Sequence, residues 1–284
     1  MELIRRVRAM RECSRRLRER GVRVGFVPTM GDLHAGHASL IRHVREQCGA
    51  TVVSVFVNPT QFGPGEDYER YPRDLAKDAD CCVAERVDYL FAPDVDELYP
   101  TDASTFVEVT GLSDRLEGRS RPGHFRGVCT VVTKLLNVVQ PSLAGFGQKD
   151  AQQAAIVRRM VRDLMLDLEL VVLPTMREAD GLALSSRNRY LSAEERRAAV
   201  AIPRALEAAR HVVAQGLHRP EEVVQAAREV LDAEPLLMVD YVELVDAASF
   251  DTVASLTGEL LLLIAVYAGA TRLIDNTELR VAPL

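Results

Sequence analysis

Two histidines three residues apart are the first feature of this sequence that could do chemistry. His34 and His37 lie in the run Pro28-Thr29-Met30-Gly31-Asp32-Leu33-His34-Ala35-Gly36-His37, between a β-branched run and a helical pattern. The start of a helix presents free amide N–H groups and the positive end of the helix dipole, which favour a phosphate. At this spacing both imidazoles point the same way. They could therefore donate hydrogen bonds to charge that develops on a leaving phosphate group.

Three further polar segments suit a nucleotide and a small acid. In Gly147-Gln148-Lys149-Asp150-Ala151-Gln152-Gln153, Lys149 can neutralise phosphate oxygens and Gln153 lies one helical turn later. Gln61 follows an apolar run, and its amide can both donate to and accept from a substrate with hydroxyls and a carboxylate. Ala183-Leu184-Ser185-Ser186-Arg187-Asn188 combines two hydroxyls with a fixed cation, as in a mobile loop over a triphosphate. Taken alone, the Lys149 segment is equally typical of an ordinary amphipathic helix start, and the Ser185–Arg187 segment is more typical of a surface loop.

The elements that must position these segments alternate between strands and helices. Strands are expected at 22–27, 51–57, 89–92, 106–109, 143–146 and 168–173, and helices at 1–20, 33–48, 73–86, 124–139 and 151–166. This order predicts an α/β fold with a Rossmann-like, doubly wound parallel sheet. In such sheets ligands bind beyond the carboxyl ends of the strands. The polar segments fall at those ends.

The pattern changes after Pro174. Helices are expected at 193–215 and 220–233, joined by a stop-and-start spacer at 215–220, and strands at 238–245 and 259–267. This predicts a smaller C-terminal α+β domain. We expect residues 1–175 to form the nucleotide-binding domain and residues 176–284 to form a small domain that covers the active site.

Net charge, cysteine content and hydropathy exclude several classes of protein. The formal net charge of −6 argues against a non-specific nucleic-acid binder. Five cysteines without a CxxC pair suit free thiols in a reducing compartment. No signal-peptide pattern and no apolar run long enough for a membrane span are present, so a cytoplasmic protein without a membrane partner is expected. The Arg-rich helix at 1–20 could touch a membrane or a partner, although a solvated face is favoured.

A strand, a glycine, the motif His-x-Gly-His and a helix follow one another in this order. This order resembles the signature of the nucleotidyltransferase and class I aminoacyl-tRNA synthetase superfamily, whose members catalyse an attack on the α-phosphate of a nucleoside triphosphate. The Ser185–Arg187 segment resembles that superfamily's second signature loop. With the segments at 123–128, 177–181 and 271–276, the ordered set from Val24 to Asn276 resembles the pantothenate synthetase family.

The resemblance implies that ATP, (R)-pantoate and β-alanine react to pantothenate, AMP and pyrophosphate through a pantoyl adenylate. It implies catalytic roles for His34, His37, Lys149 and Arg187, with His37 as the expected proton donor. It places pantoate on Gln61 and Gln153, and β-alanine on Gln61. The ATP site implied is Met30, Gly31, Asp32, Leu33, His34, Ala35, Gly36, His37, Gly147, Gln148, Lys149, Asp150, Met176, Leu184, Ser185, Ser186 and Arg187.

The resemblance also implies Mg²⁺ bound mainly through the phosphates of ATP, with Asp78 as a candidate protein contact, and a homodimer formed through the N-terminal domain. Two departures stand beside Lys149. Gln148 occupies a position where many relatives carry Glu, and Ala151 replaces a common aromatic residue.

Three other functions are compatible with the scaffold. A nucleotidyltransferase would release a nucleotide-linked product. A tRNA synthetase is disfavoured because the chain has no large anticodon-binding extension or basic stripe. A non-catalytic ATP sensor would have no need of leaving-group stabilisation by two histidines, Lys149 and Arg187.

Overall fold

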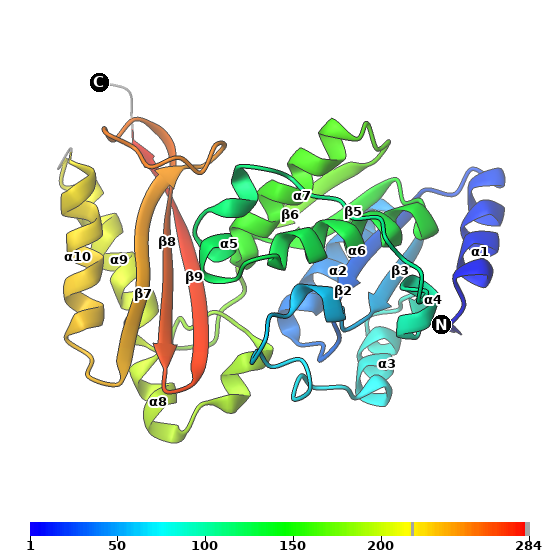
Figure 1. Ribbon diagram of the computed structural model, residues 1–284, viewed down its shortest axis with the longest axis horizontal. Coiled ribbons are helices and arrows are strands. Elements are labelled where there is room, and N and C mark those ends of the chain that lie inside the picture. Colours follow the sequence, from blue (N-terminus) through cyan, green and yellow to red (C-terminus); the bar gives the residue numbers. More distant parts are fainter. Residues whose placement is uncertain (217–218, 282–284) are drawn as a thin grey trace. The chain divides into compact units, whose positions relative to one another are not determined.

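The computed structural model describes residues 1–216 and 219–281, which form two compact units (Figure 1). The N-terminal unit comprises residues 1–148 and 152–174. The C-terminal unit comprises residues 149–151 and the described residues from Thr175 onward.

A parallel sheet forms the centre of the N-terminal unit. Its strands run in the order β1-β4-β3-β2-β5-β6. They are β1 (Glu2–Ile4), β2 (Val24–Thr29), β3 (Ala50–Val55), β4 (Tyr89–Phe91), β5 (Leu143–Gly147) and β6 (Glu169–Leu173). The helices are α1 (Val7–Glu19), α2 (Ala35–Gln47), α3 (Leu75–Ala84), α4 (Val95–Leu98), α5 (Glu117–Ser120), α6 (His124–Val139) and α7 (Ala151–Asp163), with 3-10 turns η1 (Pro59–Gln61), η2 (Leu112–Asp114) and η3 (Gln148–Asp150).

The strand order reverses beside β2. From β2 the chain passes to β3 and β4 on one side, whereas β5 and β6 lie on the other side. The turn between β2 and α2 therefore stands at the topological switch point, where doubly wound sheets bind their ligands.

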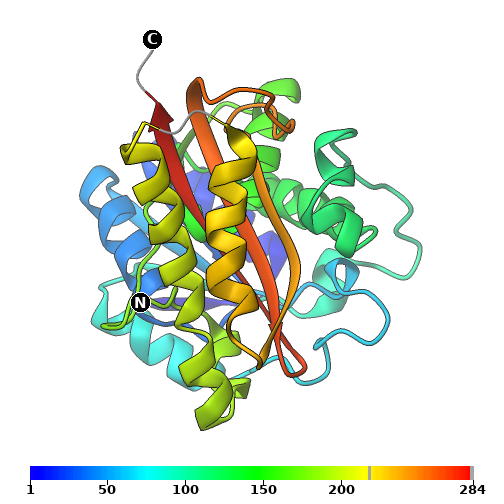
Figure 2. The same cartoon turned by 90° about the vertical axis from the view of Figure 1, so that its left-hand side faces the viewer.

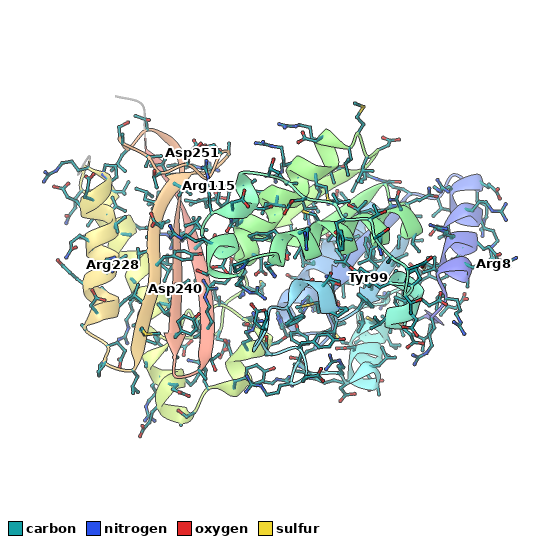
Figure 3. All side chains as sticks on the ribbon, in the orientation of Figure 1. Arg8, Tyr99, Arg115, Arg228, Asp240 and Asp251 are labelled. Atoms are coloured by element: carbon teal, nitrogen blue, oxygen red, sulfur yellow. The ribbon has the colours of Figure 1, made fainter. Side chains whose placement is uncertain are left out.

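Apolar side chains from the strands and helices pack together into a core on this sheet. On the face covered by α2 and α3, Ile41 and Val44 of α2 and Cys82 of α3 pack with Val27 and Val53 of the strands. Helix α1 buries Met10, Cys13 and Leu17 and turns its arginines to solvent, as Arg8 illustrates (Figure 3).

The C-terminal unit is a helix-on-sheet layer with its own core. Antiparallel strands β7 (Leu237–Asp246), β8 (Gly258–Ala268) and β9 (Thr271–Val281) pair in that order. Helices α9 (Ala201–Ala214) and α10 (Pro220–Asp232) lie side by side against it, after η4 (Ser186–Tyr190) and α8 (Ala193–Ala198) (Figure 2). Within 1–216 and 219–281, no helix is both long and apolar enough to cross a bilayer.

The predicted fold class is confirmed: a doubly wound parallel sheet and a smaller α+β unit are both present. Several local predictions were wrong. The segment 106–109 is not a strand, because the amide of Val107 donates to the side chain of Thr130 on α6 (3.0 Å) instead of to a neighbouring strand.

The N-terminal segment is also not one helix from residue 1. Glu2–Ile4 form an edge strand on β4, and the helix begins only at Val7.

In the C-terminal unit, the helix predicted at 193–215 is two helices, α8 and α9. Pro203 lies in the first turn of α9, where a missing N–H is tolerated. Strand β9 was not predicted as a strand. Within the 215–220 spacer, residues 217 and 218 lie outside the described residues.

Candidate active site

The turn after β2 has a conformation that few sequences tolerate. Gly31 has φ +89° and Asp32 has φ +51°, which turn the chain sharply between strand and helix. The buried carboxylate of Asp78, on α3, accepts the amide N–H groups of Asp32 (3.1 Å) and Leu33 (2.7 Å). Burial raises the pKa of Asp78, and these two amides oppose that rise. Asp78 therefore positions the turn that presents the histidines.

The two histidines cap helix α2 with their own rings. Nδ1 of His34 accepts the amide N–H of Gly36 (3.1 Å), and Nδ1 of His37 accepts that of His34 (3.3 Å). The ring centroids lie 4.1 Å apart. An Nδ1 that accepts carries no proton in the neutral ring, so the proton resides on Nε2. The pair thus presents two Nε2–H donors at the switch point, the arrangement needed to stabilise negative charge on a phosphate.

Gln61 is held at the end of η1 by a residue that sequence reasoning missed. Asn58 donates from Nδ2 to Oε1 of Gln61 (3.0 Å) and to the carbonyl of Gly127 (3.1 Å). Gln61 in turn donates to the sulfur of Met30 (3.2 Å), so it lies next to the β2–α2 turn. Asn58 stood in the same strand-end segment as Gln61. Its position directly after an apolar run was the signal available.

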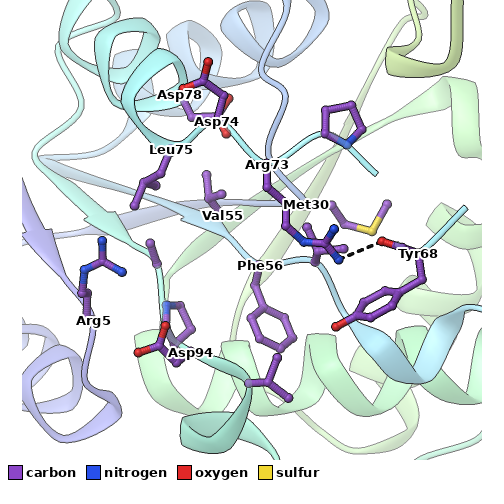
Figure 4. Close-up of a pocket in the computed structure, with 15 residues that line it drawn as sticks. Arg5, Met30, Val55, Phe56, Tyr68, Arg73, Asp74, Leu75, Asp78 and Asp94 are labelled. Carbon is purple, nitrogen blue, oxygen red and sulfur yellow. Dashed lines mark hydrogen bonds between the residues drawn. The ribbon is translucent and has the colours of Figure 1, made fainter. Parts of the chain in front are cut away.

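A pocket of about 260 Å³ opens at the carboxyl ends of β2, β3 and β4 (Figure 4). Met30, Val55, Phe56 and Leu75 give it apolar walls. Its rim includes Tyr68, Pro72 and Arg73, and Arg73 donates to the carbonyl of Tyr68 (2.8 Å).

The start of α7 holds the next predicted residues. Lys149 and Asp150 belong to η3, directly before the helix, and Nζ of Lys149 lies 3.8 Å from the Asp150 carboxylate. Asn276 of β9 donates to the carbonyl of Lys149 (3.0 Å), which places this turn in the C-terminal unit. Gln153 is half-buried in the first turn of α7.

In the C-terminal unit, segment 175–190 is fixed by ion pairs and amides. Arg177 forms a two-point ion pair with the buried Asp275 of β9 (2.6 and 3.0 Å). The amide of Leu184 donates to the carbonyl of Met176 (2.9 Å), and that of Arg187 to Oγ of Ser185 (3.3 Å).

The predicted site residues thus fall in both units. The N-terminal unit brings Met30–His37, Gln61 and Asp78 together around the β2–α2 turn, and also holds Gly147, Gln148 and Gln153. The C-terminal unit carries Lys149, Asp150, Met176 and Leu184–Arg187.

Among the residues that the structure describes, no group of three or more His, Cys, Asp or Glu side chains is arranged to hold a metal ion. The Asp78 oxygens already accept two amides, and its role as a metal contact stays a prediction.

Comparison with known proteins identifies the family. The family model described as pantoate-beta-alanine ligase matches residues 2–278. Pantothenate synthetase of Thermotoga petrophila is 50% identical over 279 residues, which are 98% of this chain and 100% of that protein. Pantothenate synthetase of Pelotomaculum thermopropionicum is 52% identical over 265 residues, or 93% and 94% of the two chains.

Solved structures agree. Pantothenate synthetase from Thermus thermophilus is 47% identical with a TM-score of 0.94, over 99% of this chain and 100% of that one. Pantoate-beta-alanine ligase from Francisella tularensis, complexed with beta-gamma ATP and beta-alanine, is 33% identical with a TM-score of 0.81, over 98% and 97%. Since these matches span nearly the whole chain, the protein is an enzyme that belongs to the pantoate–β-alanine ligase (pantothenate synthetase) family.

Proposed function

We propose that this protein condenses (R)-pantoate with β-alanine at the expense of ATP, through a pantoyl adenylate. Family membership supports the acid and the amine. The Francisella relative, solved as a complex with beta-gamma ATP and beta-alanine, supports ATP. The observation that carries the adenylate route is the pair of Nε2–H donors of His34 and His37 at the switch point of the sheet.

The reaction then proceeds in two steps. A carboxylate oxygen of pantoate attacks the α-phosphorus of ATP, an O–P bond forms, and the bond to the leaving pyrophosphate breaks. His34 and His37 donate hydrogen bonds to the charge that grows on the pyrophosphate, with His37 as proton donor. Lys149 and Arg187 neutralise phosphate oxygens. The β-alanine amine, in its neutral form, next attacks the acyl carbon, AMP leaves with the C–O electron pair, and the nitrogen gives its extra proton to solvent water.

In this scheme, two side-chain amides bind pantoate. We assign Gln61 and Gln153 to the hydroxyl and carboxylate oxygens of pantoate, and Gln61 also to β-alanine. The fixed orientation of Gln61 between Asn58 and Met30 supports this assignment, because a pre-oriented amide loses little entropy on binding.

The remaining residues surround ATP. They are Met30–His37, Gly147–Asp150, Met176 and Leu184–Arg187. We further propose that residues 1–175 act as the nucleotide- and pantoate-binding domain and that residues 176–284 cover the site. A cover would protect an adenylate that water hydrolyses readily.

Mg²⁺ fits this scheme as an ion carried by ATP. It would neutralise phosphate charge, and it prefers phosphate and water oxygens to a protein cage. The absence of a ready-made cluster of ligands among the described residues agrees with that preference.

We also propose that the protein is a cytoplasmic homodimer that binds neither nucleic acid nor membrane. Support comes from the family resemblance, from the net charge of −6 and from five free cysteines, which suit a reducing compartment.

ATP–pyrophosphate exchange tests the proposal on the purified protein with Mg²⁺. Exchange that requires pantoate but not β-alanine is the expected result, because the first step is reversible without the amine. Exchange with a different acid, or none with any acid, would contradict the function while leaving the fold intact.

A further inference from the structure

The main chain of Gln61 is held by side chains that the catalytic scheme does not use. Its carbonyl oxygen accepts a hydrogen bond from Nδ1 of His124 (2.8 Å) and a longer one from Nη2 of Arg121 (3.4 Å). His124 is the first residue of α6. Asn58 meanwhile holds the side-chain amide. Gln61 is thus fixed at both its backbone and its side chain.

The contacts of His124 determine its tautomer. Nη1 of Arg121 lies 3.1 Å from Nε2 of His124. A guanidinium can only donate, so Nε2 accepts and the ring proton sits on Nδ1. That proton is the one given to the Gln61 carbonyl. Burial and the Arg121 charge lower the pKa of His124 to about 4, so the ring stays neutral near pH 7.

Glu66 completes the arrangement from the loop that follows Gln61. Its two carboxylate oxygens accept from Nε of Arg121 (2.8 Å) and from Nη2. The guanidinium is thereby neutralised, and it is mostly buried. Because its charge is already paired within the protein, Arg121 is better suited to hold Gln61 than to bind a substrate carboxylate.

Close packing transmits these contacts to the site. A Cβ atom on Gly127 of α6 would lie 2.3 Å from the carbonyl oxygen of Thr60, so the helix backbone abuts η1 directly. Since the interior has no slack there, a change in the His124 hydrogen bond moves Gln61.

We propose that Glu66, Arg121 and His124 are positioning residues that set the affinity of the enzyme for its acid substrate by fixing Gln61. This inference rests on the proposed role of Gln61 in binding pantoate. It goes beyond that role by assigning a function to three residues that touch no substrate atom in the scheme.

Substitution of His124 tests the proposal. His124→Leu keeps a similar volume but removes the donor, and we expect the KM for pantoate to rise by about 10-fold or more, the loss of one buried hydrogen bond. Since Gln61 is also assigned to β-alanine, its KM should rise as well, whereas the KM for ATP should stay within about twofold. His124→Asn places an amide N–H where Nδ1 stands and should restore the KM for pantoate.

A matched pair of variants covers the case in which His124→Leu fails to fold. Glu66→Gln weakens the pair with Arg121, and Glu85→Gln weakens a more exposed two-point pair that Arg42 of α2 makes with the residue after α3. Only Glu66→Gln should raise the KM for pantoate.

The outcomes separate the two proposals. Equal KM values for pantoate in the wild type, His124→Leu and Glu66→Gln would overturn the positioning role and leave the function standing. A rise in all three KM values, or a fall in kcat alone, would also overturn it, since fixing Gln61 predicts a selective effect. Absence of pantoate-dependent exchange in the wild type would overturn the function, and this inference with it.

Discussion

At the scale of single residues, hydrogen bonds decide what each histidine can do. His34 and His37 accept amides at Nδ1 and present Nε2–H, whereas His124 donates from Nδ1 and accepts at Nε2. The same residue type thus presents an Nε2–H donor in one place and clamps a backbone carbonyl in another. Local contacts, and not the sequence motif alone, assign these roles.

Variants of His37 can distinguish its role in capping helix α2 from its proposed role in catalysis. We expect His37→Ala to reduce ATP–pyrophosphate exchange by about 10²–10³-fold, the usual loss for one donor to a developing anion. His37→Asn can still accept the His34 amide at the former Nδ1 position but has no group in place of Nε2–H. It should lose as much exchange as the alanine variant and less thermal stability. Exchange near the wild-type rate in His37→Asn would show that Nε2–H does not serve the reaction.

His124 predicts a dependence of stability on pH. Its pKa is lowered from 6.5 to about 4 in the folded protein, so the unfolded chain binds more protons between these values. Folding stability should therefore be unaffected by His124 above pH 6.5 and should fall as the pH drops from 6.5 towards 4, by at most about 3 kcal/mol.

Urea unfolding of the wild type and His124→Asn across this pH range measures the effect. The variant keeps the donor but cannot titrate, so the stability difference between the two proteins should change only within that window. Parallel pH curves would contradict the lowered pKa.

At the scale of elements, the β2–α2 turn depends on a glycine with no room for a side chain. A Cβ on Gly31 would lie 2.7 Å from Oδ2 of Asp78 and 3.0 Å from Val55, at a φ of +89°. Gly21, in the turn after α1, has a φ of +70° with nothing within 4 Å of the same position.

Gly21→Ala should therefore cost only the left-handed backbone strain, about 1–2 kcal/mol. Gly31→Ala should cost more, because Asp78 must move and release the amides of Asp32 and Leu33. It should also reduce pyrophosphate exchange, which Gly21→Ala should not. Equal losses of stability and exchange in the two variants would refute the clamp role of Asp78.

Elements marked by a local pattern, such as an apolar run or a helical period, could be predicted from the sequence. Strands β2, β3 and β5 are buried on both faces and read as apolar runs, and helix α6 shows a clear helical period. Strand β1 is three residues long, and it exists because Glu2–Ile4 find β4 far along the chain. The segment 106–109 has strand-like composition but no strand partner among the described residues. Pairing between distant segments is what local patterns cannot reveal.

The same limit applies to the site. His34, His37, Gln61 and Lys149 could be proposed as site residues because reactive side chains at strand ends stand out in the sequence. The positioning contacts of Asn58, Asp78 and Arg121 could not be predicted from the sequence. Each of these residues holds another one through hydrogen bonds that form only in the folded chain.

At the scale of the whole molecule, two separate cores stabilise the chain. Val27, Val44 and Leu90 belong to the core of the N-terminal unit, whereas Ile202 and Leu262 belong to that of the C-terminal unit. Each unit also carries proposed ATP contacts, so activity requires both cores to be folded. A lesion in the second core should therefore abolish catalysis without unfolding the first.

Arg177→Met tests this separation. It leaves Asp275 buried without its cation, which typically costs about 3–5 kcal/mol. Arg219→Met removes an exposed pair with Glu222 in the same unit and should leave the stability nearly unchanged, because water screens this pair. By hydrogen exchange, Arg177→Met should lower the protection of amides in β7–β9 and leave that of β2–β5 unchanged. Pyrophosphate exchange should fall as well, since Arg177 anchors the segment that holds Met176. Loss of protection in both sheets to the same extent would mean that the two units unfold as one.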